Sequence, residues 1–436
     1  MLRVFAASLA VRLLYPLAHA IFRAQHIPAN TFAFAEIGNI ALNIFHGRGF
    51  SSPFSEGNVP TAWECPLMPY LWAAVMRLQG EASERTYRAL VLLQTIPTAL
   101  SVSLYWLVAR YVTRRAPRVP SYTPAAAALV FCFWPESLLR IPEIWYYQWQ
   151  ELAIALLVCA ALWWCDDPKR RSGAALGAAA GILALINVTP LPVYAVALME
   201  PFIRRRAPLR AMAGAAAVSA AVAGSIVAPW LIRNAVELHA FVPMRSNGWY
   251  ELFQGNNPRG CIREQATSLH PALNAQEAAL YKSLGEIGYV RLCRERALNY
   301  MRAHPAQTVW RATERFYVVW CTDIFDRWPW DARERLERTA FTWIRYITIT
   351  CSAVVPLVIV IYGLFSGGLS ELPHPLVFLS LFVFMPLPHY FTLADHEYVQ
   401  TMRTWLAFLA IIVLLRRCGL SGDSPERRDL EQQAHR

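Results

Sequence analysis

Apolar runs of about 20 residues, separated by basic or polar stretches, recur along the chain. A helix of that length crosses a hydrocarbon core of roughly 30 Å. The runs predict membrane helices at 4–24, 87–112, 122–139, 144–165, 208–230, 341–364, 374–392 and 401–416. A further run, 173–203, is broken at Asn187-Val188-Thr189-Pro190, and because proline interrupts a helix interior it predicts two shorter helices, 173–186 and 190–203. The pattern therefore predicts an all-α polytopic membrane protein with about ten spanning helices.

Two longer polar stretches interrupt this pattern. The first loop, residues 25–86, contains an amphipathic helix that begins near Glu36 and a second short helix from Pro66 to Met76. The second stretch is the outer segment, residues 231–340, where the spacing of apolar residues predicts amphipathic helices near 274–303. The sequence thus predicts four parts. They are an N-terminal transmembrane module that includes the first loop (1–230), an outer helical segment (231–340), C-terminal transmembrane helices (341–416) and a charged cytoplasmic tail (417–436).

The charged residues set an orientation in the membrane. The chain is 56% hydrophobic and 16% charged, with a net charge of +11. Arginines cluster after apolar runs near 114, 170, 205 and 416, and the positive-inside rule assigns such clusters to the cytoplasm. This predicts a multi-pass plasma (inner) membrane protein with both termini cytoplasmic and both long loops outside. The charge does not indicate a nucleic-acid partner.

The nine cysteines indicate no metal site by their spacing. They form no CxxC pair, and no Cys/His spacing is typical of zinc. Cys261 and Cys293 both fall in the outer segment, where a disulfide is chemically allowed. Whether they pair is left open by the sequence.

Ordered motifs in the loops resemble a known family. The first loop carries AEIGNIALNIFHGRGFSSPF and then PTAWECPLMPYL, and later come FWPE (133–136), PE (142–143), APWLIRN (228–234), FVPMRSN (241–247) and GNNP (255–258). This set resembles the GT-C glycosyltransferases, specifically the bacterial family 39-like branch related to protein mannosyltransferases and aminoarabinose transferases. The resemblance implies a GT-C-like helical bundle and a monosaccharide donor on polyprenyl phosphate. It also implies inverting transfer on the outer face, with an acid of the first loop as base.

Such a reaction needs a base and a cation, and the loops offer candidates for both. A carboxylate that takes the acceptor proton is typically worth 10²–10⁴-fold in rate. Glu36 is the first candidate base and Glu64 the second, and both stand in apolar company. Arg233, at the predicted membrane edge, and then Arg245 are candidates for the leaving phosphate.

Further residues are candidates for binding the substrate. These are Trp63 as a stacking surface for a sugar, Asn234 and Asn256 as hydrogen-bonding groups, and Glu143 with Tyr146 as lining residues. Each also has a plain structural interpretation: Asn beside Gly is common in turns, and Glu is common at helix starts. A divalent metal on Glu36 and Glu64 is compatible with the sequence, but no ligand spacing demands one.

The sequence therefore predicts a membrane glycosyltransferase that transfers a monosaccharide from polyprenyl phosphate to the hydroxyl of a glycan, lipid or protein. Two alternatives stay open at this point. A transporter or flippase of lipid-linked sugars would share the apolar groove and the arginines, and an inverted repeat would favour it. A non-catalytic scaffold with the same fold is the other alternative.

Overall fold

The computed structural model describes residues 1–22, 36–259, 269–321, 340–394 and 398–420. Regular structure in these ranges is helical, apart from an isolated β-bridge between Ser51 and Pro60. The N-terminal helices are α1 (Leu2–Phe22), α2 (Glu36–Phe45), α3 (Leu67–Gln79), α4 (Glu84–Arg115), α5 (Thr123–Cys132), α6 (Pro135–Leu139), α7 (Tyr147–Asp166), α8 (Arg170–Ile186) and α9 (Leu191–Ile203). The remaining helices are α10 (Leu209–Leu238), α11 (Gly248–Gly255), α12 (Ala275–Ala303), α13 (Pro305–Cys321), α15 (Ala340–Phe365), α16 (Pro375–Phe384), α17 (Leu387–Phe391) and α18 (Gln400–Leu420).

Three helices in the described ranges, α4, α7 and α10, are long and apolar enough to cross a membrane. Shorter apolar helices occur at Thr123–Leu139, Leu191–Ile203, Cys351–Phe365 and Pro375–Phe391. These features support an all-α, membrane-associated protein. The finer expectation of about ten spans stays a prediction.

Prolines account for most differences between the predicted and observed helices. The run 122–139 is split into α5 and α6, and Pro135 begins the second piece. The run 374–392 is split into α16 and α17 beside Pro386. Proline has no backbone N–H and clashes with the preceding turn, which favours such breaks. By contrast, α10 continues through Pro229 to Leu238, so Arg233 lies inside this helix instead of after it.

The break expected near Pro190 is confirmed, and it leaves α8 free to pack along α10. Gly173, Gly177 and Gly181 are spaced four residues apart and line one face of α8. A Cβ atom on Gly177 would lie 2.1 Å from the backbone oxygen of Ser219 in α10. Small residues at this spacing let two helix backbones approach closely, which is the usual way apolar helices pack in membranes.

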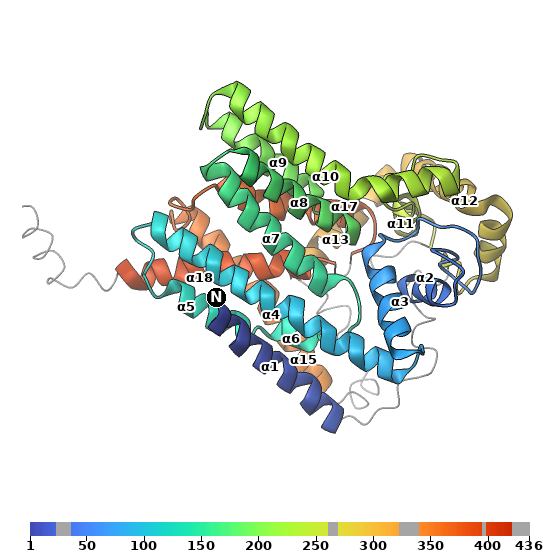
Figure 1. The fold of residues 1–436 in the computed structure, drawn as a ribbon, viewed down its shortest axis with the longest axis horizontal. Helices are drawn as coiled ribbons and strands as arrows, with labels where there is room; N and C mark the ends of the chain where they lie inside the picture. Colours follow the sequence, from blue (N-terminus) through green and yellow to red (C-terminus); the bar gives the residue numbers. More distant parts are fainter. Residues whose placement is uncertain (23–35, 260–268, 322–339, 395–397, 421–436) are drawn as a thin grey trace, which may run out of the picture.

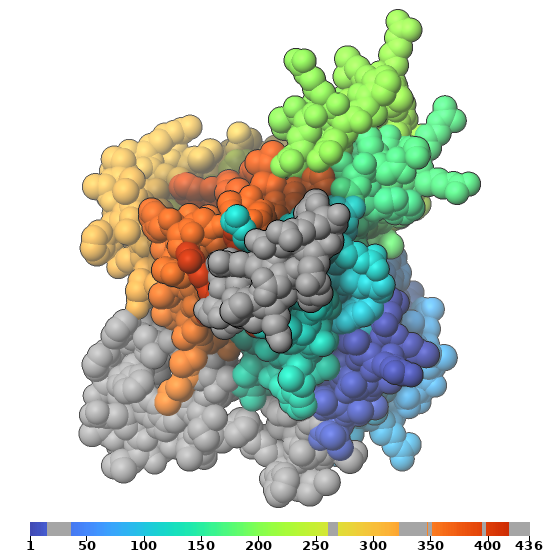
Figure 2. Space-filling model, turned by 90° about the vertical axis from the view of Figure 1, so that its left-hand side faces the viewer, coloured from blue at the N-terminus to red at the C-terminus, as the bar shows by residue number. Residues whose placement is uncertain are grey.

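The bundle has two distinct ends. Helices α2, α3, α11 and α12 lie together at one end, on the right of Figure 1, and we call this the loop end. The opposite end, which faces the viewer in Figure 2, carries the C-terminal turns of α4 and α7 and the loop before α16, and we call it the basic end. Arg115 pairs with Asp166, and Arg118 and Arg416 both pair with Glu371, at 3.3 and 3.1 Å. The arginine clusters near 114 and 416 therefore meet at one end of the bundle.

Some expectations fall outside the described residues. These are the start of the first loop (25–35), most of the tail (421–436) and Cys261, so the pairing of Cys261 with Cys293 stays a prediction.

Candidate active site

The first loop is folded back on α2 by asparagine side chains. Asn43 of α2 donates from Nδ2 to the carbonyls of Ser51 (3.0 Å) and Ser52 (3.1 Å). Gly47 and Gly49, with φ of 78° and 75°, make the turn that ends the helix. Glycine is favoured there because positive φ is strained for residues with a Cβ. These contacts close the loop against α2 and place residues 60–66 beside the outer segment.

Two further helices, α10 and α12, hold residues 60–66 in place. Glu286 of α12 accepts hydrogen bonds from the Thr61 hydroxyl and from the backbone N–H of Ala62 (2.9 Å). Arg233 of α10 donates to the carbonyls of Thr61 and Phe50, the latter at 2.7 Å. The segment that carries Glu64 is therefore fixed by charged groups from both the transmembrane module and the outer segment.

Glu36, at the first turn of α2, is held by a histidine of the outer segment. His270 Nε2 lies 2.8 Å from Glu36 Oε1, and His270 Nδ1 accepts the backbone N–H of Ala272. With Nδ1 acting as acceptor, Nε2 carries the hydrogen that His270 donates to Glu36. Burial alone would raise the pKa of Glu36, but His270 and the charge of Arg245 outweigh it and hold the pKa below its ordinary value. Glu36 is therefore an ionised, engaged carboxylate.

Glu64 has a different environment. Only 7% of the residue is exposed. No side chain in the described part of the chain hydrogen-bonds its carboxylate. Burial raises the pKa of Glu64 to about 7, the nearby charge of Arg245 opposes this, and Glu36 adds to it. Glu64 is therefore a carboxyl group whose proton exchanges near neutral pH.

Arg245 links the two acids. Its Nε donates to Asn247 Oδ1 at 2.5 Å, and its guanidinium lies 3.7 Å from Glu251 Oε1. Burial disfavours the charged form of this arginine, but Glu64, Cys65 and Glu251 outweigh burial and raise its pKa above the ordinary value. Tyr146, buried at the start of α7, belongs to the same electrostatic group, since Arg245 and Glu64 both act on its hydroxyl.

A cavity of about 580 Å³ opens beside Arg245. It lies between the loop after α10, α11 and α12, and it is lined by Arg245, Arg291, Arg294, Phe241, Trp249 and Thr392 among others. Arg294 stacks over the Trp249 ring, and Phe241 is 81% exposed at the mouth. Cations beside exposed aromatic groups suit a ligand with an anionic head and an apolar tail.

Two of the predicted substrate-binding residues on α10 are engaged in holding the fold. Arg233 uses its guanidinium for the first-loop carbonyls, and it also donates to Asn234 Oδ1 at 3.1 Å. Asn234 is fully buried and donates to the carbonyl of Val242. These contacts fix the loop after α10 instead of leaving the side chains open to a ligand.

Trp63, Asn256 and Glu143 are also engaged with other parts of the protein. Trp63 is fully buried among Phe54, Tyr250 and other aromatic side chains, so its ring offers no face for a sugar. Asn256 is buried and donates to the carbonyls of Leu252 and Phe391. Glu143 pairs with Arg140 at 2.8 Å between α6 and α7. Of the predicted site residues, the structure brings together Glu36, Glu64, Arg245 and Tyr146.

His270 and Glu286 belong to this site, but no pattern in the sequence marks them as site residues. His270 lies 234 residues from Glu36, and Glu286 lies 225 residues from Thr61. A charged residue in an amphipathic stretch is usually solvated, so only the fold identifies these two as contacts of the first loop.

Comparison with known proteins adds one finding. Residues 85–257 match the model of glycosyltransferase family 87. The matched segment runs from α4 to the turn after α11 and includes Tyr146 and Arg245, but it does not reach Glu36 or Glu64. No curated protein and no solved structure matches the chain. The match supports a membrane glycosyltransferase, but it does not support the family 39-like branch expected from the loop motifs.

Proposed function

We propose that the chain transfers a monosaccharide from a polyprenyl phosphate to an acceptor hydroxyl, with inversion, at the loop end of the bundle. The family 87 match over residues 85–257 supports glycosyl transfer. The observation that carries the location is the group formed by the buried Glu64, the half-buried Glu36 and Arg245, beside a cavity with cationic and apolar lining. The apolar helix α10 leads to this cavity. Only 17% of its most apolar stretch is buried within the protein, which leaves a lipid-facing path for a polyprenyl tail.

In this proposal Glu64 is the base. A general base works best with a pKa near the operating pH, and the pKa of Glu64 is about 7. Glu36 ranks first on sequence grounds, but His270 already engages its carboxylate and lowers its pKa, which makes it a weaker base. Its remaining role is electrostatic, because the negative charge of Glu36 helps to keep the pKa of Glu64 high.

The transfer then proceeds as a single displacement. The acceptor oxygen attacks the anomeric carbon, the bond from that carbon to the phosphate oxygen breaks, and Glu64 takes the acceptor proton. Arg245 neutralises the charge that develops on the leaving phosphate, and Arg291 and Arg294 extend the positive lining of the cavity. A preorganised cation of this kind acts most strongly where the charge appears in the transition state.

The experiment is to assay transfer from a short-chain polyprenyl-phosphate sugar with Glu64→Gln, Glu36→Gln and the matched control Glu56→Gln. Glu56 lies in the same loop but its side chain is 74% exposed. We expect Glu64→Gln to lower transfer by about 10²–10⁴-fold while donor binding is kept, and Glu56→Gln to change neither. Full transfer by Glu64→Gln would refute the base assignment. Movement of donor lipid across vesicles without any transfer by the unsubstituted chain would favour a flippase, and neither activity would favour a scaffold.

A further inference from the structure

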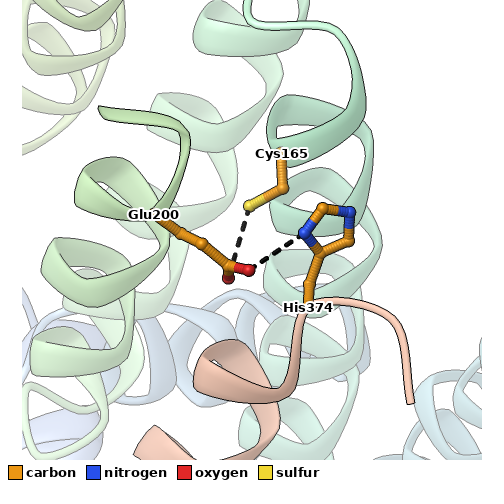
Figure 3. A group of neighbouring side chains, drawn as sticks. All are labelled: Cys165, Glu200 and His374. Atoms are coloured by element: carbon orange, nitrogen blue, oxygen red, sulfur yellow. Dashed lines mark hydrogen bonds and ion pairs between the residues drawn. The ribbon is translucent and has the colours of Figure 1, made fainter. Parts of the chain in front are cut away.

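Three side chains of different chemistry converge at the basic end of the bundle, far from the candidate active site. Figure 3 shows Cys165 near the end of α7, Glu200 in α9 and His374 just before α16 pointing toward one another. Their exposed fractions are at most 3%. One donor atom from each lies within 4.8 Å of the others. Buried groups of this kind need either protons and partners or a shared ion.

The distances between donor atoms suit a small transition-metal ion. Cys165 Sγ lies 3.7 Å from Glu200 Oε2, and His374 Nδ1 lies 3.0 Å from Glu200 Oε1. Around a tetrahedral zinc ion, with bonds of about 2.0–2.3 Å, two donor atoms are about 3.3–3.5 Å apart. Glu200 therefore sits between the sulfur and the imidazole with one oxygen toward each.

A second layer of side chains orients these donors. His374 Nε2 lies 3.0 Å from Asp166 Oδ1, and Arg115 pairs with the same carboxylate. When Nε2–H is donated to Asp166, Nδ1 keeps a lone pair that faces Glu200 Oε1. A histidine fixed by a carboxylate in this way is typical of metal ligands. Arg204 Nε, 2.9 Å from Glu200 Oε1, holds the second carboxylate.

The backbone at His374 is also held in an unfavourable conformation. Its φ of 51° and ψ of 56° lie in the left-handed region, which is uncommon for a residue with a Cβ. Such strain persists where the surroundings determine the position of the side chain. Here it turns the imidazole inward, between Asp166 and Glu200.

We propose that Cys165, Glu200 and His374 bind one transition-metal ion of the zinc class. The thiolate of Cys165, Nδ1 of His374 and the carboxylate of Glu200 would supply the mixed S, N and O donor set that zinc accepts. Binding converts the Cys165 thiol to the thiolate and releases its proton to solvent. The ion would join α7, α9 and the loop before α16, which are distant in sequence. This proposal does not depend on glycosyl transfer.

The test uses the purified full chain, Zn²⁺ and Co²⁺. We expect about one zinc per chain, a thiolate-to-cobalt charge-transfer absorption on replacement with Co²⁺, and a higher thermal unfolding midpoint with metal than with chelator. Cys165→Ser should lose the absorption and bind metal more than about tenfold more weakly. The matched control is Cys159→Ser, on the same helix but outside the cluster, which should keep both.

The alternative is a metal-free network in which a protonated His374 bridges Asp166 and Glu200. It would leave the unfolding midpoint of the unsubstituted chain unchanged by zinc or chelator, and that result would overturn the proposal even if Cys165→Ser failed to fold. An absorption that survives in Cys165→Ser would overturn it as well. His374→Gln should behave like Cys165→Ser if the ion is bound.

Discussion

Glu64 and Glu36 are separated by 28 positions in one loop, yet their surroundings give them opposite pKa shifts. His270 and Arg245 favour the charged form of Glu36, whereas burial favours the neutral form of Glu64. Two neighbouring carboxyl groups with separated pKa values can take different roles, one as a fixed charge and one as a proton carrier. The surroundings of these two side chains therefore determine which of them can act as the base in the proposed reaction.

A raised pKa at Glu64 predicts a defined dependence of stability on pH. The folded chain keeps the Glu64 proton up to a pKa of about 7, whereas the unfolded chain loses it near 4.5, so this group favours folding less as the pH rises between the two values. Glu64→Gln cannot titrate. We expect it to gain stability relative to the unsubstituted chain between pH 5 and pH 8, on the order of 2–3 kcal/mol. Thermal unfolding in detergent at both pH values measures this difference. An equal gap at pH 5 and pH 8 would contradict the burial of Glu64, and Glu56→Gln is the control.

Arg245 and Arg233 form a second contrast between a ligand-facing and a structural residue. Arg245 borders the cavity, whereas Arg233 holds the carbonyls of Thr61 and Phe50. We expect Arg245→Gln to lower transfer by about 10²-fold, because the charge on the leaving phosphate loses its cation. Arg233→Gln should lower the free energy of unfolding by about 1–3 kcal/mol, because buried carbonyls lose their donor. Transfer rates and unfolding midpoints are measured for both variants. Full transfer by Arg245→Gln, or an unchanged midpoint in Arg233→Gln, would contradict the role given to that residue.

At the scale of elements, the contact between α8 and α10 sets the position of the site. The C-terminal end of α10 carries Trp230, whose Nε1 donates to the carbonyl of Met244 at 2.7 Å, one residue before Arg245. Any shift of α10 is therefore passed on to the cavity. The glycines of α8 determine how closely α10 approaches.

This contact predicts an asymmetric response to alanine substitution. Gly177→Ala places a methyl group 2.1 Å from the Ser219 oxygen, so we expect a loss of about 1–3 kcal/mol in stability and weaker transfer. The control Gly214→Ala lies on α10 with nothing within 4 Å of the added Cβ, and it should be neutral or stabilising because alanine favours helix. The thermal unfolding midpoints of Gly177→Ala and Gly214→Ala measure this difference in stability. Equal effects would mean that the two helices do not pack closely.

At the scale of the whole molecule, the two ends of the bundle have different chemistry. The loop end holds Glu36, Glu64 and a cavity with cationic lining, and the basic end holds the arginine clusters and the Cys165, Glu200 and His374 group. From the positive-inside rule we propose that the loop end faces the outer surface of the plasma membrane. A donor on polyprenyl phosphate would be used there.

This orientation predicts the accessibility of single cysteines in intact cells. Glu56→Cys, at an exposed position of the first loop, should react with a membrane-impermeant thiol reagent. Arg171→Cys, at an exposed position of the basic end, should react only after the membrane is permeabilised. The unsubstituted chain gives the background from native cysteines. The opposite labelling pattern would invert the proposed topology.

The sequence by itself determined the helices and the location of the candidate acids. Apolar runs and proline breaks act within a few residues of the chain, so they place α4, α7 and the break between α8 and α9. The Gly- and Pro-rich first loop, with Glu36 and Glu64, is visible for the same reason. The helix breaks beside Pro135 and Pro386 were the main errors, because a proline in an apolar run is tolerated in some helices and ends others.

Only the tertiary structure decided what the polar side chains do. The pKa of a buried acid depends on its distance from charges elsewhere in the fold, and His270, the histidine that holds Glu36, lies 234 residues away along the chain. Arg233 and Trp63 suited a ligand by position, but packing directs them into the protein. Cys165, Glu200 and His374 have no ligand spacing in sequence, and they converge because the ends of α7 and α9 lie beside the start of α16. Local patterns fix elements, whereas contacts between remote side chains exist only after those elements pack.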